Sequence, residues 1–203
     1  MNLPKSFLVL LGCCLLLVAA VMAKSKNSVT PPAWEGTERK GPGKTVVYLV
    51  RHAEKASAQT MMSSAAMAED PELSPAGQER AQALKAKLGK KRPAALFATP
   101  YRRTRQTLQP LAEATNLEIH PYDARNGQAL AQKIRQEYAG KTVVVAGHSN
   151  TVLPLLEALG GTKPFPEIAD HHYDYLFKVT LQENKPTKVE VATYGKPSVA
   201  PVH

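Results

Sequence analysis

The segment from Thr45 to Lys55 reads TVVYLVRHAEK, and it decides how the rest of the sequence is interpreted. Its first six residues are mostly β-branched and apolar, which is typical of a strand that is buried on both faces. The apolar run stops at Arg51 and His52. The segment therefore predicts a central strand that carries a guanidinium and an imidazole at its carboxyl end.

Outward from this strand, helical patterns and short apolar runs alternate along the chain. Further buried strands are expected at Ala94–Ala98, Leu117–Tyr122 and Thr142–Ala146. Helices are expected at Pro75–Leu88, closed by Gly89, and at Arg102–Ala114, Gln128–Tyr138 and Thr151–Leu159. Tyr173–Leu181 and Lys188–Thr193 alternate like antiparallel strands near an edge. The predicted fold is an α/β three-layer sandwich: a mostly parallel central sheet, helices on both faces, and antiparallel edge strands near the C-terminus.

Polar side chains follow three of these strands. Arg51 and His52 follow the first strand, residues 99–103 (TPYRR) follow the second, and residues 147–150 (GHSN) follow TVVVA. Ligand sites of such sheets lie beyond the carboxyl ends of the strands. Guanidinium groups match phosphate oxygens in pairs, and a neutral imidazole can attack phosphorus. The pattern therefore predicts a pocket for a tetrahedral phosphate group.

Three strings carry a family resemblance: VVYLVRHAEK, ATPYRRTRQT and VVVAGHSNT. In this order they resemble the histidine phosphatase superfamily, also called the phosphoglycerate mutase-like superfamily, over most of residues 45–181. The resemblance implies that His52 is the nucleophile that becomes phosphorylated. It implies that Arg51, Arg103 and His148 complete the phosphate pocket. Asn150 is a further candidate for substrate binding.

Departures from the family pattern bear on the chemistry. The segment between Arg103 and His148 is short and lacks the insert of the mutases, so a compact phosphatase is expected. The family most often has Gly where this chain has Ala53, and its acid phosphatase branch has a proton-donating Asp where this chain has Ser149. The general acid is therefore sought elsewhere. Glu54 is the first candidate, and Asp70 and Glu72 are the others.

Composition limits the alternatives. Among 203 residues, 26 Lys and Arg face 17 Asp and Glu, giving a net charge of +9 that suits an anionic partner. The basic runs carry no interleaved aromatic residues, so nucleic acid is not predicted as a partner. Both cysteines, Cys13 and Cys14, precede the expected domain, which excludes a disulfide scaffold and a cysteine nucleophile there. His171 and His172 are adjacent and would point to opposite faces of a strand, so neither a metal nor a cofactor is predicted.

The N-terminus reads as a targeting segment. Residues 1–23 have a positive start, an apolar run and small residues before a cleavage point after Ala23, which is the layout of a secretory signal peptide. A retained membrane anchor or a lipid attached at Cys13 are the alternatives, so membrane attachment through this segment stays open. Residues 24–44 are expected to be a linker and residues 45–203 the histidine phosphatase-like domain. All these alternatives place the domain outside the cytoplasm, in the periplasm or secreted.

The expected function is that of a metal-independent phosphomonoesterase that acts through a phosphohistidine on His52. The alternative is a phosphate-ligand binding protein of the same fold, with no activity or very weak activity. The partner is expected to be a small phosphorylated substrate. Sugar phosphates, lipopolysaccharide phosphates, phosphoprotein and inorganic polyphosphate all stay open, and the sequence says nothing of the oligomeric state.

Overall fold

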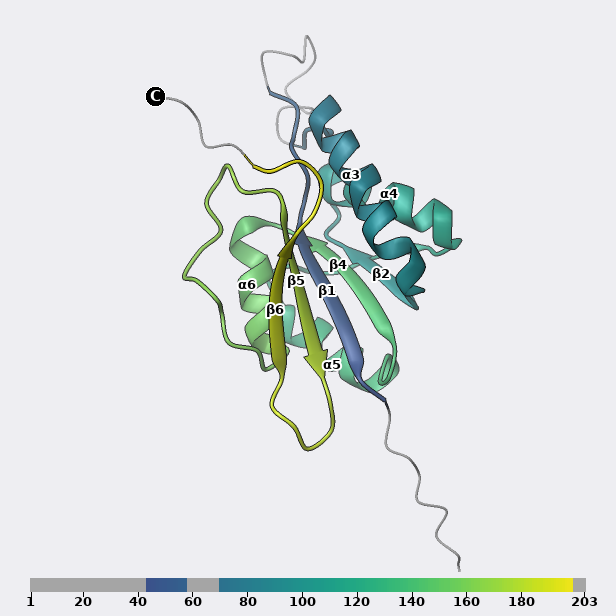
Figure 1. Cartoon of the computed structure of the whole chain (residues 1–203), viewed down its shortest axis with the longest axis vertical. Helices are drawn as coiled ribbons and strands as arrows, with labels where there is room; N and C mark the ends of the chain where they lie inside the picture. The colour runs from purple at the N-terminus through teal and green to yellow at the C-terminus, as the bar shows by residue number, and fades with distance from the viewer. Residues whose placement is uncertain (1–42, 58–69, 199–203) are drawn as a thin grey trace, which may run out of the picture. The chain divides into compact units, whose positions relative to one another are not determined.

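The computed structural model describes residues 43–57 and 70–198, which form a six-stranded sheet with four α-helices around it (Figure 1). The expected signal segment and nearly all of the linker lie outside the described residues. The strands are β1 (Thr45–Arg51), β2 (Ala95–Ala98), β3 (Ile119–Pro121), β4 (Thr142–Gly147), β5 (Tyr175–Leu181) and β6 (Lys188–Thr193). The helices are α3 (Pro75–Leu88), α4 (Arg102–Thr115), α5 (Gly127–Glu137) and α6 (Ser149–Ala158), and a 3-10 turn, η1, spans Gly89–Lys91.

The sheet has the order β3-β2-β4-β1-β5-β6. Strands β1 to β4 are parallel, whereas β5 runs antiparallel to β1 and β6 antiparallel to β5. The predicted mostly parallel sheet with antiparallel edge strands is thus confirmed. β1 lies between β4 and β5, which explains why its sequence is apolar on both faces.

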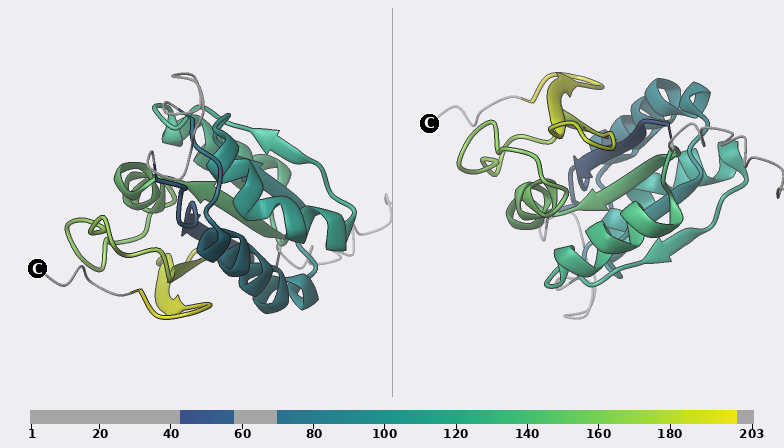
Figure 2. Two further views of the ribbon diagram at one scale, coloured as in Figure 1. Left: turned by 90° about the horizontal axis from the view of Figure 1, so that it is seen from above. Right: turned by 90° about the horizontal axis from the view of Figure 1, so that it is seen from below.

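Helices cover both faces of the sheet. Leu84 of α3 and Leu111 of α4 belong to the core on one face, and Ile134 of α5 and Leu156 of α6 to the core on the other. Figure 2 shows the sheet between these two helix pairs. Strands that are neighbours in the order β3-β2-β4-β1 are followed by helices on opposite faces. Such a reversal opens a crevice at the carboxyl ends of the two strands.

The ends of several elements differ from the predictions. Asn116 adopts a left-handed conformation (φ 53°), and the Leu117 N–H closes the C-terminus of α4, so β3 begins only at Ile119. Gly89 stays right-handed (φ −55°), because the chain continues into η1 and Arg92 takes the left-handed position instead. In the described part of the chain, no helix is both long enough and apolar enough to span a membrane.

Candidate functional site

The end of β1 fixes the orientation of His52. This residue is only 5% exposed, and its backbone N–H donates to the Gly147 carbonyl at 2.9 Å, which extends the pairing of β1 with β4. Nδ1 of His52 lies 2.8 Å from the Ala53 carbonyl oxygen. Because a carbonyl can only accept, Nδ1 carries the proton and the lone pair of the neutral ring is on Nε2. The Ala53 N–H in turn donates to Thr107 Oγ1 at 2.9 Å, which anchors this turn on α4.

His148 lies opposite His52, with ring centroids 5.4 Å apart. Its Nδ1 is 3.5 Å from Nη2 of Arg103, and its Nε2 is 2.9 Å from Thr99 Oγ1. Since arginine only donates, Nδ1 of His148 is the acceptor and Nε2–H donates to Thr99. The carboxyl ends of β1, β2 and β4 therefore bring together two neutral imidazoles and Arg103. We call Arg51, His52, Arg103 and His148 the phosphate pocket.

Burial and positive neighbours keep both imidazoles uncharged. Burial first, and then the Arg51 and Arg103 guanidiniums, lower the pKa of His52 to about 3, against the opposing hydrogen bond to Ala53. Burial also lowers the pKa of His148 to about 4, with help from the same two arginines. At neutral pH the positive charge of the pocket therefore resides on the guanidiniums, and both rings are free to act as neutral groups.

Arg51 is held by a loop that the sequence did not single out. Its Nη1 donates to the carbonyls of Ala169, Asp170 and His172 at 2.8–3.2 Å, and its guanidinium lies 4.2 Å from the centre of the Tyr173 ring. Its Nε is buried and has no hydrogen-bond partner among the described residues. A buried N–H without a partner costs about 1–3 kcal/mol. Such a donor marks a place where a ligand oxygen would be bound.

Asp70 lies beside Arg103. Its Oδ1 is 3.4 Å from Nη1 of Arg103, and both carboxylate oxygens are 3.0 Å from the backbone N of Arg102, the first residue of α4. The carboxylate thus caps the helix from outside and touches the phosphate pocket through Arg103. Glu72 is instead half-exposed and paired with the Arg102 side chain. Of the three carboxylates that the sequence suggested, Asp70 is the one in contact with the pocket.

Glu54 has a different partner. Its carboxylate receives hydrogen bonds from Nε and Nη2 of Arg80 at 2.7–3.0 Å, and Arg80 is only 4% exposed. The Glu54 carbonyl also accepts from the Ser74 N–H, which ties the start of α3 to the end of β1. The pair with a buried arginine gives Glu54 a structural role, which joins the end of β1 to α3. Its predicted catalytic role stays a prediction.

We expect Arg80→Ala to lower the free energy of unfolding by about 3 kcal/mol, because it leaves the Glu54 carboxylate without its buried partner. It also removes the hydrogen bond from Arg80 to the Tyr194 carbonyl. Urea unfolding would measure the change. Lys133→Ala, which removes an exposed pair with Glu137, is the control and should cost less than about 0.5 kcal/mol. Equal midpoints for Arg80→Ala and the wild type would contradict the structural role of this pair.

The structure locates two further sets of residues that the sequence analysis considered. Asn150 lies in the first turn of α6 with an exposed side chain, so its predicted part in substrate binding stays a prediction. His171 and His172 precede β5 and do not lie on a strand, and their rings are tilted with centroids 4.2 Å apart, so the expectation that they point to opposite faces of a strand is wrong. No group of three or more His, Cys, Asp or Glu with metal-binding geometry occurs in residues 43–57 and 70–198.

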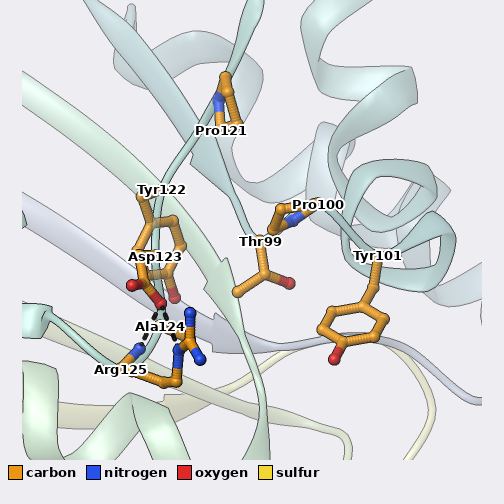
Figure 3. A pocket seen from close by; sticks show the side chains of 8 residues that line it. All are labelled: Thr99, Pro100, Tyr101, Pro121, Tyr122, Asp123, Ala124 and Arg125. Carbon is orange, nitrogen blue, oxygen red and sulfur yellow. Dashed lines mark hydrogen bonds and ion pairs between the residues drawn. The ribbon is translucent and has the colours of Figure 1, made fainter.

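A cavity of about 700 Å³ adjoins the phosphate pocket, and we call it the lateral cavity. It is lined by residues 99–101, which follow β2, and residues 121–125 at the end of β3 and beyond it. Figure 3 shows Thr99 and Tyr101 on one side and Tyr122, Asp123 and Arg125 on the other. Thr99 and Tyr101 both contact His148, so the two hollows share a wall.

Comparison with known proteins agrees with this geometry. The model of the histidine phosphatase superfamily (branch 1) matches residues 47–125, which include Arg51, His52 and Arg103. A search of curated proteins found no significant match.

Solved structures share the fold at low identity. The native mycobacterial glucosyl-3-phosphoglycerate phosphatase superposes with a TM-score of 0.58 and 15% identity, covering 75% of this chain and 100% of its own. A protein from Agrobacterium tumefaciens, named as a phosphohistidine phosphatase (SixA), has a TM-score of 0.53 and 23% identity, covering 77% of this chain and 99% of its own. Phosphoglycerate mutase from Bacillus anthracis has a TM-score of 0.52 and 13% identity, covering 75% of this chain and 94% of its own.

These likenesses concern the same strands that carry the phosphate pocket. The family match covers most of β1 and all of β2 and β3, whereas β4 and His148 lie outside it and are compared through the overall fold alone. Residues 47–125 therefore match the histidine phosphatase superfamily (branch 1), and the described residues share their fold with the solved phosphatases.

Proposed function

We propose that the protein is a metal-independent phosphomonoesterase that forms a phosphohistidine on His52. The observation that carries the proposal is the state of this imidazole. It is buried and neutral, its proton is held on Nδ1 by the Ala53 carbonyl, and Arg51 and Arg103 lie close enough to lower its pKa. A neutral imidazole with a fixed tautomer between two cations suits nucleophilic attack on a phosphate group.

The reaction has two displacement steps. In the first, the Nε2 lone pair of His52 attacks phosphorus, the N–P bond forms, and the bond from phosphorus to the alcohol oxygen breaks. The alcohol takes a proton and leaves. In the second step water attacks phosphorus, the N–P bond breaks, and inorganic phosphate and neutral His52 are released. Arg103 and Arg51, whose Nε–H has no partner among the described residues, would stabilise the negative charge on the phosphoryl oxygens in both steps.

We propose Asp70 as the group that protonates the leaving alcohol. Its carboxylate touches Arg103, which would itself bind the substrate phosphate. A bound phosphate would lie beside Arg103, so Asp70 is the candidate carboxylate placed to pass a proton to the departing oxygen.

The site of action is proposed from the N-terminal segment alone. We propose that residues 1–23 export the protein, so that the enzyme acts in the periplasm or is secreted, or stays attached to a membrane by an uncleaved or lipidated segment. Tracking the full chain fused to a reporter that is active only after export would test this. Activity of the reporter only in the cytoplasm would contradict it.

We expect the protein to release phosphate from an aryl phosphate and to retain this activity in EDTA, because guanidiniums supply the charge that two metal ions supply in other phosphatases. An aryl oxide leaves readily without a proton, so the rate with an aryl phosphate depends on the nucleophile and not on the general acid. Loss of activity in EDTA that a divalent cation restores would contradict the metal-independent mechanism. Binding of phosphate without any turnover would instead favour a phosphate-ligand binding protein of this fold.

A further inference from the structure

We infer that the lateral cavity binds the alcohol portion of the substrate and that this portion is a ring carrying several hydroxyl groups, so that the substrate is a phosphorylated carbohydrate. The inference rests on the proposed function, since it assigns the leaving group of the same reaction. Three features of the cavity support it: its place in the fold, one exposed aromatic ring, and the polar groups on its far wall.

The cavity lies where the topology opens a crevice. β2 and β3 are neighbours, but α4 follows β2 on one face and α5 follows β3 on the other. The phosphate pocket occupies the equivalent position between β1 and β4. Thr99 connects the two, because it lines the cavity and its Oγ1 is 2.9 Å from Nε2 of His148. A substituent on a phosphate bound beside His148 therefore has the lateral cavity as its neighbouring space.

Tyr101 forms an exposed but fixed wall of this cavity. It is 44% exposed, and among the described residues Val191 is the only other large hydrophobic side chain as open to solvent. Yet its ring is held, with the Arg103 guanidinium 4.4 Å from its centre and the His148 ring edge-on at 5.1 Å. A large ring that is exposed and still held by two pocket residues is well placed for ligand contact. Arg103 covers one face of the ring, so the part of the ring left exposed is the surface that would contact the C–H face of a sugar ring.

The opposite wall carries a donor beside an acceptor (Figure 3). Asp123 Oδ1 accepts from the backbone N–H of Arg125 at 2.9 Å and from its Nε at 3.2 Å. In the described part of the chain, the Arg125 Nη groups and Asp123 Oδ2 have no other hydrogen-bond partner. Tyr122 lines the cavity too. Burial raises its pKa to about 12 against the nearby Thr151 hydroxyl, so its O–H keeps its proton.

These groups discriminate between leaving groups. Hydroxyls donate and accept at once, so neighbouring hydroxyls on a ring can satisfy a carboxylate and a guanidinium placed side by side. Both side chains are exposed, so water is their partner in the free protein. A ring with hydroxyls would replace the hydrogen bonds of the water it displaces, whereas a simple alkyl chain would not. A second anionic group would face the Asp123 carboxylate. A ring with several hydroxyls therefore fits both the flat Tyr101 wall and the polar Asp123–Arg125 wall.

The test compares leaving groups of similar intrinsic reactivity. The 6-phosphates of glucose, galactose and mannose would be compared with ethyl phosphate by kcat/KM on the full-length protein. We expect at least one sugar phosphate to exceed ethyl phosphate by about tenfold or more. Arg125→Ala should reduce that preference by about three- to tenfold, the value of one or two hydrogen bonds. Tyr101→Ala should reduce it similarly, while Tyr101→Phe, which keeps the ring, should preserve it.

Controls separate this inference from the proposed function. Arg105→Ala removes an exposed arginine of α4 outside both hollows and should keep the sugar preference. If turnover depends on His52 but no sugar phosphate is preferred, the carbohydrate assignment is wrong and the proposed function stands. If Arg125→Ala and Arg105→Ala both keep the preference, the lateral cavity does not bind the sugar ring, and the proposed function stands. If no phosphate ester is hydrolysed, or turnover survives His52→Ala, the proposed function itself fails.

Discussion

His52→Ala should reduce phosphate release by more than about 10⁴-fold, because no other neutral nitrogen in the phosphate pocket has a free lone pair for attack on phosphorus. His148 cannot replace it, since its Nδ1 faces Arg103 and its Nε2–H donates to Thr99. In the wild type, brief reaction with a labelled substrate followed by denaturation should trap phosphate that is stable to alkali and labile to acid. That stability is the signature of a phosphohistidine. The variant should trap none.

His120→Gln is the control for this experiment. His120 is also an imidazole at the sheet, but it lies on β3 and packs against Phe97, outside the phosphate pocket. It should keep both turnover and the trapped label. Circular dichroism and thermal unfolding would show that His52→Ala is folded. A folded His52→Ala protein with undiminished turnover would overturn the mechanism, and label found on another residue would move the nucleophile.

Local sequence was sufficient for the parts of the fold that depend on local patterns. The apolar run of β1 and the TVVVA run of β4 identified the two central strands, and their ends placed His52 and His148 at one edge of the sheet. Because parallel strands of one sheet point their carboxyl ends the same way, residues far apart in sequence could be brought together without knowing any contact. The structure does bring Arg51, His52, Arg103 and His148 together in this way.

Contacts between loops and between distant elements could not be predicted from the sequence. The loop carbonyls around residue 170 that hold Arg51 come from a segment without a regular pattern, and Tyr173, expected to begin a strand, instead precedes β5 and lies over Arg51. Glu54, two residues after His52, was the first candidate for the general acid. β1 ends at Arg51, however, and a buried arginine of α3 captures the carboxylate. The signal that could have identified this pair is Arg80 itself, a charge on the buried face of an amphipathic helix.

The lateral cavity could not be predicted from the sequence either. Its two walls follow adjacent strands, but residues 121–125 had no recognisable motif, so nothing in the sequence connected Arg125 with Tyr101. The signal was the strand order, in which β3 lies beside β2 and their helices cover opposite faces. Only that order turns two ordinary loops into the sides of one cavity.

Asp70→Asn should slow the hydrolysis of an alkyl phosphate by about 10²-fold or more and that of an aryl phosphate by less than about tenfold. An alkoxide leaves slowly unless a proton arrives with it, whereas an aryl oxide leaves without help. The amide keeps the size of the side chain but has no acidic proton. Glu72→Gln is the matched control, because Glu72 pairs with Arg102 at the same end of α4 without touching Arg103, and both substrates should react as with the wild type. Equal losses for the two substrates in Asp70→Asn would show that Asp70 acts by holding Arg103 in place. No loss for either substrate would remove Asp70 from the reaction, and water or a carboxyl group elsewhere would then supply the proton.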